Sequence, residues 1–507
     1  MPGRPSNNND DSSSWSYISP RMAFLMVSMS LGQLGDGLNI FQGIYLVGVG
    51  WNESSVGKAL SLMGLTALLV QPFAGDFVDR ATVDRRVFLT VASVITAISA
   101  STILMVRHGN TDHMLIYTSK IFEGIASSFI GPCLAALTMA CFGPDRFDEV
   151  MASNIYWGHV GSVMAAGLAG LVAYMSYPDI KFCFLIIGAS ALIAIVFVQS
   201  LPQGDPLMGR GFRSADDADT VLRLDSSDSE AGDDVQKPAT ENSPLIVSSI
   251  VAPAPAQPEF PEASSYMDVF LERKTCILCC TGFFFHFANA NVLLVLGELM
   301  GQEGEHDKSD TANRNAIPLT AGAIIMAQVT MAFATQLGDN YTARGTGRKV
   351  LFMAGLLSLP IRCALIIAFS NAGSAFLLST QIFDGIGGGL MGLIQPLIIA
   401  DITFGTGRFN AVSKYLWALD CSLIFHAMSL ILLFVHADGL IASCFGLGAT
   451  LSNYLGQMVV EHYGHIASLT GSLFLSVIPI IVFSTMPETY GLRGQSRMDT
   501  KTQSLSV

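Results

Sequence analysis

Long apolar runs, separated by short polar interruptions, fill most of the chain. A helix that crosses the hydrocarbon core of a bilayer needs about 20 apolar residues. The first half contains six such runs, at residues 22–47, 56–74, 87–106, 114–141, 152–175 and 182–200. Six more follow at 276–300, 317–337, 350–370, 374–403, 437–460 and 466–486. Because the core of a soluble protein does not repeat such runs so regularly, the pattern predicts an all-α polytopic membrane protein.

The polar segments divide the chain into domains. Residues 201–272 are acidic, rich in Asp, Ser, Pro and Ala, and too poor in large apolar residues to fold alone, so they are predicted to form a disordered cytoplasmic linker. Residues 1–21 and 488–507 are polar and are predicted to be cytoplasmic ends. This leaves one six-helix bundle at 22–200 and a second at 273–487, the latter with an insert at 415–438.

Composition narrows the function. The chain is 51% hydrophobic and 13% charged, and its net charge of −13 comes largely from the acidic linker, so we expect no nucleic-acid partner. The nine cysteines lie mostly in apolar runs without zinc or disulfide spacing, so we expect no metal and no cofactor. Because neither a nucleophile triad nor a nucleotide-binding glycine loop stands out, the sequence favours neither an enzyme nor an ATP-driven pump.

The two halves repeat. A charged cluster lies between two apolar runs at Gly75–Arg86 and again at Gly338–Lys349. Ile121–Ile125 matches Ile382–Ile386 at a shift of 261, and residues 142–147 match 404–409 at 262. A near-constant shift over separate motifs indicates duplication. With both clusters on the cytoplasmic side, cytoplasmic segments hold 19 Lys and Arg residues and the outer loops hold 4, which is the expected asymmetry.

One segment breaks the repeat. Beyond these motifs the shift rises to 286, so the second half carries 286 − 262 = 24 additional residues, near 415–438. They contain an apolar run long enough to span a membrane, and a thirteenth crossing would reverse the helices after it. Our hypothesis is that the insert is translated intron outside the working architecture, with residues 437–460 in the eleventh helical position. A genuine extra helix is the alternative.

Two six-helix halves, a long central linker and these charged clusters resemble the Major Facilitator Superfamily of secondary transporters. In that family the cluster reads Gly-x-x-x-Asp-Arg-x-Gly-Arg-Arg. The residues here that fit it are Gly75, Asp79, Arg80, Arg85 and Arg86, and in the second copy Asp339, Arg348 and Lys349. The Gly405–Asn410 stretch resembles a poorly characterised branch of the superfamily. The resemblance implies two bundles related by pseudo-two-fold symmetry, and secondary active transport of a small solute by alternating access, with proton coupling expected.

Ionisable groups are costly at mid-bilayer unless they are paired or line a wet cavity, so those present are the first candidates for a pathway. They lie on the first, fourth, seventh and tenth runs. Within each run the polar residues are three positions apart, so they lie on one face of that helix. In the resembled family these four helices line the central cavity. The predicted substrate and proton pathway consists of Gln33, Asp36, Asn39, Lys120, Glu123, His286, Asn289, Gln381 and Asp384.

Each pathway residue has a structural alternative. Asp36 is the first choice for a proton- or substrate-handling carboxyl, against a packing role in a hydrogen bond to a neighbouring Ser or Asn. Lys120 and Glu123 would bind an anionic or zwitterionic substrate, or neutralise each other while Lys120 reaches outward. His286 suits proton coupling or a hydrogen-bonded packing role. Arg362, deep in the ninth run, faces Asp384 or a cavity.

The charged clusters are predicted to close the cytoplasmic side through ion pairs that break when the halves rock apart. The alternative is a pair of charged turns that only set the orientation. The predicted gating residues are Gly75, Asp76, Asp79, Arg80, Arg85, Arg86, Gly338, Asp339, Arg344, Arg348 and Lys349, with Arg146 and Arg408 from the third repeated motif.

The expected partners are the lipid bilayer, a small-molecule substrate and protons. Glu241–Ile246 in the linker resembles an acidic dileucine signal and is a candidate site for a sorting adaptor. We expect an integral multi-pass protein of the plasma membrane or of a vacuolar or lysosomal type of membrane. Two rival functions stay open: a passive facilitator, and a sensor or scaffold that keeps this fold without transporting.

Overall fold

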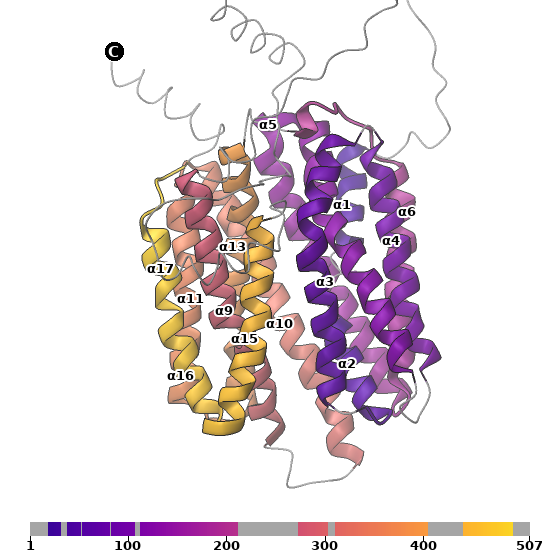
Figure 1. Ribbon diagram of the computed structural model, residues 1–507, viewed down its shortest axis with the longest axis vertical. Helices are drawn as coiled ribbons and strands as arrows, with labels where there is room; N and C mark the ends of the chain where they lie inside the picture. Colours follow the sequence, from indigo (N-terminus) through magenta and orange to yellow (C-terminus); the bar gives the residue numbers. More distant parts are fainter. Residues whose placement is uncertain are drawn as a thin grey trace, which may run out of the picture.

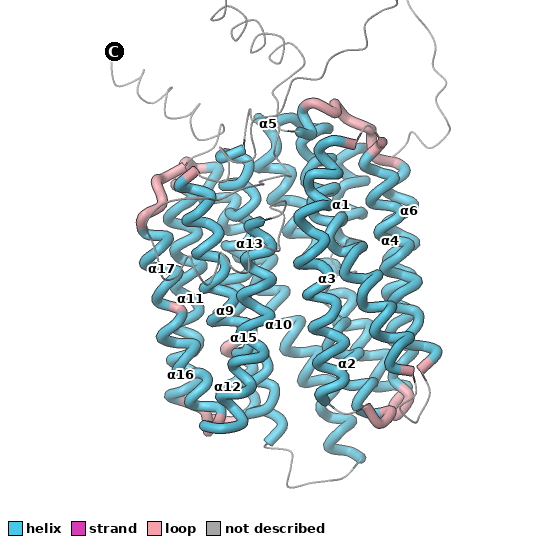
Figure 2. Tube along the Cα trace, viewed as in Figure 1, coloured by secondary structure: helices cyan, strands magenta, loops and turns pink. Residues whose placement is uncertain are grey.

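The computed structural model describes residues 19–31, 38–51, 53–81, 83–106, 112–210, 272–302, 310–403 and 440–489, and every regular element among them is a helix. Two bundles of roughly parallel helices stand side by side, one from each half of the chain (Figures 1 and 2). Eight of the described helices are long and apolar enough to cross a membrane. The predicted all-α polytopic fold is therefore confirmed.

The helices of the two bundles follow the predicted apolar runs. The first bundle consists of α1 (Pro20–Leu31), α2 (Asn39–Gly48), α3 (Glu53–Arg80), α4 (Arg85–Ser101), η2 (Thr102–Met105), α5 (His113–Ser176), η3 (Ile180–Phe184), α6 (Leu185–Gln199) and η4 (Met208–Arg210). The second consists of α9 (Arg273–Gln302), α10 (Asp310–Ala343), α11 (Arg348–Ala368), α12 (Ser374–Ser379), α13 (Gln381–Thr403), α15 (Leu440–Tyr463), α16 (His465–Leu475) and α17 (Val477–Ser484).

Helix α5 joins the fourth and fifth predicted helices, because the residues between the two apolar runs, 142–151, are almost entirely helical as well. Only Gly143, with φ 69° and ψ 172°, leaves the helical conformation, and Pro144 opens the next helical segment. Glycine tolerates this backbone conformation, and proline fits a first helical position because the amide hydrogen it lacks would have no partner there. The polar residues that follow form helical turns at the membrane surface instead of a loop.

The charged clusters are also more helical than expected. Helix α3 continues to Arg80 and α10 to Ala343, and the next helices begin at Arg85 and Arg348. Extending the helices keeps their backbone groups hydrogen-bonded until the chain has left the hydrocarbon region, where unpaired groups are costly. The charges of each cluster therefore lie on helix ends and short turns.

Close helix packing recurs in both halves. A Cβ atom added to Gly161 on α5 would lie 1.9 Å from the Met29 carbonyl oxygen on α1. A Cβ on Gly448 of α15 would lie 2.3 Å from the Phe283 carbonyl oxygen on α9. Small residues allow such backbone approach between membrane helices. Helix α15 thus packs on α9 as the second part of α5 packs on α1, the place expected for an eleventh helix. The insert at 415–438 lies outside the described residues.

The bundles meet along α5 and α10 and along α3 and α15. We call the end of the bundles that carries the charged clusters the cytoplasmic end, as predicted from the sequence, and the opposite end the outer end. At the outer end, Ala321 of α10 joins the first bundle's core and lies against Gly170 of α5. At the cytoplasmic end, Phe147 of α5 joins the second bundle's core. Each half therefore inserts part of one helix into the other, and Figure 1 shows α10 between the two bundles. We call the α5 and α10 contact the main seam.

Candidate functional site

Part of the predicted site lies outside the described residues, and its roles stay predictions. The residues concerned are Gln33, Asp36 and Arg408, the side chains of Asn39, Asp76, Asp79 and Arg80, and the sorting motif Glu241–Ile246. The remaining predicted residues form several separate groups.

A buried network joins three helices of the second half. Arg362 of α11 is 1% exposed, and its Nη1 lies 2.6 Å from Asp384 Oδ1 on α13. The same nitrogen donates to Asn289 Oδ1 on α9 at 3.2 Å, and Nη2 donates to Gln381 Oε1 at 3.3 Å. The Asn289 amide also donates to Asp384 Oδ1, at 3.4 Å. Of the two positions considered for Arg362, the one facing Asp384 is confirmed.

His286 lies outside this hydrogen-bonded group. Its ring centroid is 4.9 Å from that of Phe445 on α15, at an angle of 37°. Both residues belong to the second half, so this contact packs two helices of one bundle together.

The first half buries an ion pair within a single helix. Lys120 Nζ lies 2.8 Å from Glu123 Oε2 on α5, and the two side chains are 2% and 3% exposed. They neutralise each other as one alternative expected, but Lys120 points into the protein instead of reaching outward. Because desolvating two charges often costs more than their attraction returns, a buried pair is weak evidence for stability.

The two pairs occupy equivalent places in the repeat. At the shift of 261, Glu123 corresponds to Asp384 and Lys120 corresponds to Gln381. Each half therefore has one ion-paired acid at the same position. The first half takes the cation from the same helix, whereas the second takes it from α11 as Arg362.

At the cytoplasmic end, an ion pair crosses between the halves. Arg348, 1% exposed at the start of α11, has Nη2 at 2.6 Å from Asp148 Oδ2 on α5. Its Nη1 lies 2.8 Å from Asp401 Oδ2 on α13 and donates to the Leu397 carbonyl oxygen. Asp148 belongs to the first half and Asp401 to the second. One guanidinium thus holds two carboxylates, one in each half.

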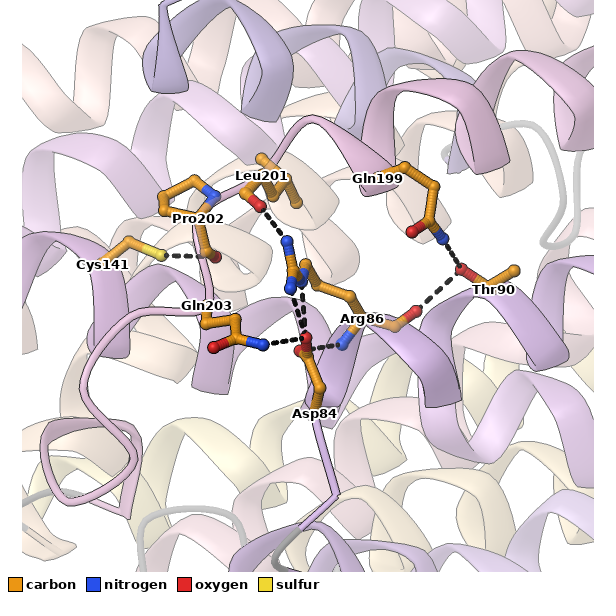
Figure 3. A network of polar contacts seen from close by, with 8 residues as sticks. All are labelled: Asp84, Arg86, Thr90, Cys141, Gln199, Leu201, Pro202 and Gln203. Atoms are coloured by element: carbon orange, nitrogen blue, oxygen red, sulfur yellow. Dashed lines mark hydrogen bonds and ion pairs between the residues drawn. The ribbon is translucent and has the colours of Figure 1, made fainter. Parts of the chain in front are cut away.

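The first charged cluster makes different contacts. Figure 3 shows Arg86, which donates from Nε to Asp84 Oδ2 at 2.7 Å and from Nη1 to the Leu201 carbonyl oxygen at 2.6 Å. Gln203 donates to the same Asp84 oxygen at 3.2 Å. Burial raises the pKa of Asp84, but the hydrogen bonds and charge of Arg86 outweigh it, so the pKa lies below its ordinary value. Arg85 donates to the Pro206 carbonyl oxygen at 3.4 Å.

These contacts bind the start of the predicted linker to the first bundle. Asp205 donates its amide to the Ala140 carbonyl oxygen at 2.9 Å, and Gly204, with φ 71°, packs against the same residue. Residues 201–210 therefore cover the start of α4 and the kinked middle of α5 near Gly143.

The other predicted gating residues take local positions. Gly75 is buried on α3, and Gly338 packs against Leu390 and Leu393. Lys349 donates to the Ser484 carbonyl oxygen at 2.6 Å. Arg146 lies 5.7 Å from the ring of Phe142, and Arg344 lies 5.9 Å from that of Tyr341. Asp339 lines a cavity of about 480 Å³ between α1, α5 and α10, together with the ion-paired Arg21 and Glu149.

Sequence analysis missed three polar residues at contacts between helices. Asp148 and Asp401 each lie near the cytoplasmic end of an apolar run, but only the fold brings them to Arg348. His159 on α5 lies 2.7 Å from Gln328 on α10, across the main seam. The signal for His159 was a single titratable residue within an apolar helix, which alone names no partner.

Known proteins resemble most of the chain. The model of the Major Facilitator Superfamily matches residues 15–424. Two uncharacterized MFS-type transporters of Mycobacterium tuberculosis, from strains CDC 1551 and H37Rv, are 27% identical over 484 residues, which cover 93% of this chain and 94% of each relative.

Solved structures share the fold at low identity. The nucleoside transporter NupG has a TM-score of 0.55 at 14% identity and covers 92% of this chain and 99% of its own. The human organic anion transporter MFSD10 has a TM-score of 0.54 at 14% identity and covers 92% of this chain and 97% of its own.

Proposed function

The chain belongs to the Major Facilitator Superfamily, and we propose that it moves a small polar solute by alternating access, coupled to protons. That it is an integral, multi-pass membrane transporter follows from the family, its relatives and its apolar helices. The coupling and the solute class are the proposed part.

The observation that carries alternating access is the position of Arg348 between Asp148 and Asp401. When the halves separate at the cytoplasmic end, Arg348 leaves Asp148 but keeps Asp401, so its charge is never left buried without a partner. Asp148 then meets water at the membrane surface. The lost charged hydrogen bond is worth about 1.5–3 kcal/mol, an energy that solute binding can supply.

The buried ion pairs support a polar solute and a coupled proton. In each half a carboxylate on a helix that lines the central cavity in this family pairs with a cation, which comes from the same helix in the first half and from α11 in the second. A solute with hydrogen-bonding groups can replace part of either pair. A proton on Glu123 or Asp384 removes that acid's charge and frees its cation, which links proton binding to the polar contacts of the pathway.

Uptake into proteoliposomes tests the proposal. The purified protein is reconstituted and given a panel of radiolabelled sugars, amino acids, nucleosides and organic anions, with and without an inward proton gradient. Accumulation above the external concentration only with the gradient supports proton coupling. Equilibration without accumulation identifies a passive facilitator, and a solute that raises thermal stability but is not taken up identifies a sensor.

A variant of Asp148 tests the cytoplasmic ion pair in an experiment that needs no substrate. Asp148→Asn should increase the population of molecules whose cytoplasmic ends are apart. Double electron–electron resonance measures this distance between spin labels on Val83 and Tyr341, which are 50% and 42% exposed. An unchanged distance distribution would contradict a gating role for Asp148.

A further inference from the structure

His159 and Gln328 form a bridge at the middle of the main seam. His159 Nδ1 lies 2.7 Å from Gln328 Oε1. His159 is 11 residues from Asp148, which marks the cytoplasmic end of the seam, and 11 residues from Gly170, which marks the outer end. At the helical rise this places the bridge about 16 Å from each end. The α5 and α10 helices cannot separate at this level without breaking it.

The bridge fixes where the imidazole carries its hydrogen. The Gln328 carbonyl oxygen only accepts, so His159 Nδ1 must donate, and the neutral ring then has a lone pair on Nε2. That nitrogen is buried and has no hydrogen-bond partner among the residues that the structure describes. His159 therefore holds a basic nitrogen that the closed seam leaves unused.

A proton on this nitrogen would have no counter-ion in the arrangement described. Residues 22–31 of α1, 317–338 of α10 and 150–176 of α5 contain no acidic or basic side chain other than His159. The nearest charged groups of these helices are Arg21, Glu149 and Asp339, which line the cytoplasmic cavity. Helix α13, which also contacts α5, carries its two acids next to arginines, with Asp384 at Arg362 and Asp401 at Arg348.

We propose that His159 is the proton acceptor that opens the main seam. A proton taken from water onto Nε2 places a positive charge on a buried nitrogen for which the described residues supply no counter-ion, and the closed arrangement disfavours such a charge. The protonated protein therefore shifts to an arrangement in which α5 and α10 separate around His159 and the imidazolium meets water. Loss of the proton to the other side allows the seam to close again. This role deepens the proton coupling proposed above and rests on alternating access.

His286, the histidine that sequence analysis selected, is less suited to this role. It packs against Phe445 within the second bundle, so charging it does not act on a contact between the halves. At the shift of 286, Phe445 is also the repeat equivalent of His159. The second half thus has an aromatic ring where the first half has a titratable group.

Spin-label distances in the full-length, reconstituted protein test the proposal. One label pair reports the cytoplasmic side, on Val83 and Tyr341, and a second reports the outer side, on Met114 and Tyr463, which are 76% and 78% exposed. Distances are recorded between about pH 8 and pH 5, the range in which histidine changes charge. If one proton is linked to opening, the ratio of open to closed populations rises by at most about tenfold for each unit by which the pH falls.

The decisive variant is His159→Asn. Its amide nitrogen can occupy the place of Nδ1 and keep the hydrogen bond to Gln328, but the side chain has no basic nitrogen. We expect its populations to stay constant across the pH range. His159→Gln serves as a second variant without a base, and His286→Asn is the matched control that should keep the wild-type pH response.

Each outcome has one meaning. A pH response that survives in both His159 variants overturns the proposal, as does one that is lost in His286→Asn. If Asp148→Asn separates the labels but pH has no effect, His159 is not the proton acceptor while alternating access stands. If neither pH nor Asp148→Asn changes any distance, alternating access itself fails.

Discussion

The most direct test of the buried charges is Asp384→Asn. The substitution keeps an amide oxygen near Arg362 but removes the negative charge that lies 2.6 Å from its Nη1. Arg362 is 1% exposed, so it cannot turn to water. Its remaining contacts are neutral: Asn289 at 3.2 Å and Gln381 at 3.3 Å. The variant therefore leaves a buried cation with dipoles but without a counter-ion.

The expected loss of folding stability follows from how exposed the Arg362 and Asp384 side chains are. Removing one member of a buried ion pair lowers the folding stability by about 3–5 kcal/mol. Because Asn289 and Gln381 still accept hydrogen bonds from Arg362, we expect Asp384→Asn to lie near the lower end of this range. Arg362→Met removes the cation instead, and it should cost less because the Asp384 side chain is 18% exposed and can be hydrated. The double variant buries no charge and should recover most of the stability.

Thermal unfolding of the purified protein in detergent measures this order. We expect the lowest midpoint for Asp384→Asn, an intermediate one for Arg362→Met and a nearly wild-type one for the double variant. Asp179→Asn is the control, because the Asp179 and Lys181 side chains of that ion pair are 44% and 29% exposed. A double variant as unstable as Asp384→Asn would refute the charge argument and assign the stability to the neutral hydrogen bonds.

Three further predictions concern other parts of the molecule. Gly161→Ala should lower the unfolding midpoint strongly, because its Cβ would lie 1.9 Å from a backbone oxygen, whereas Gly188→Ala, with nothing within 4 Å, should not. Asp84→Asn should destabilise the protein near pH 7; since the folded-state pKa is lowered, the wild-type advantage is complete above about pH 4 and disappears as the pH falls through the folded-state pKa. Glu123→Gln should reduce proton-driven uptake and lower the midpoint, and Lys120→Met in the same chain should restore the midpoint but not the uptake.

The helices could be predicted from the sequence because a membrane-spanning helix needs a long apolar run. Candidate pathway residues could be selected because burying a polar group in the membrane costs free energy, which makes such residues rare. Asn289 was selected on the seventh run, Gln381 and Asp384 were selected on one face of the tenth, and the structure joins all three through Arg362. Local spacing is enough for residues of one helix, such as Lys120 and Glu123.

Contacts between distant helices could not be predicted in this way. Asp148 meets Arg348 and His159 meets Gln328 only after the two bundles pack against each other, and no sequence spacing encodes that distance. The continuity of α5 could not be predicted either, because polar residues interrupt the apolar pattern at 142–151, whereas a glycine followed by a proline changes the helix direction within a single residue.

The unequal origin of the two buried cations has a consequence for mutational tolerance. In the first half, acid and base lie on one helix, so their replacement disturbs a single segment. In the second half, one arginine connects three helices, and any substitute must satisfy all of them at once. Randomised libraries at positions 120 and 123 should therefore yield many folded members, whereas libraries at 362 and 384 should yield few. Redesign of solute preference is best begun in the first half.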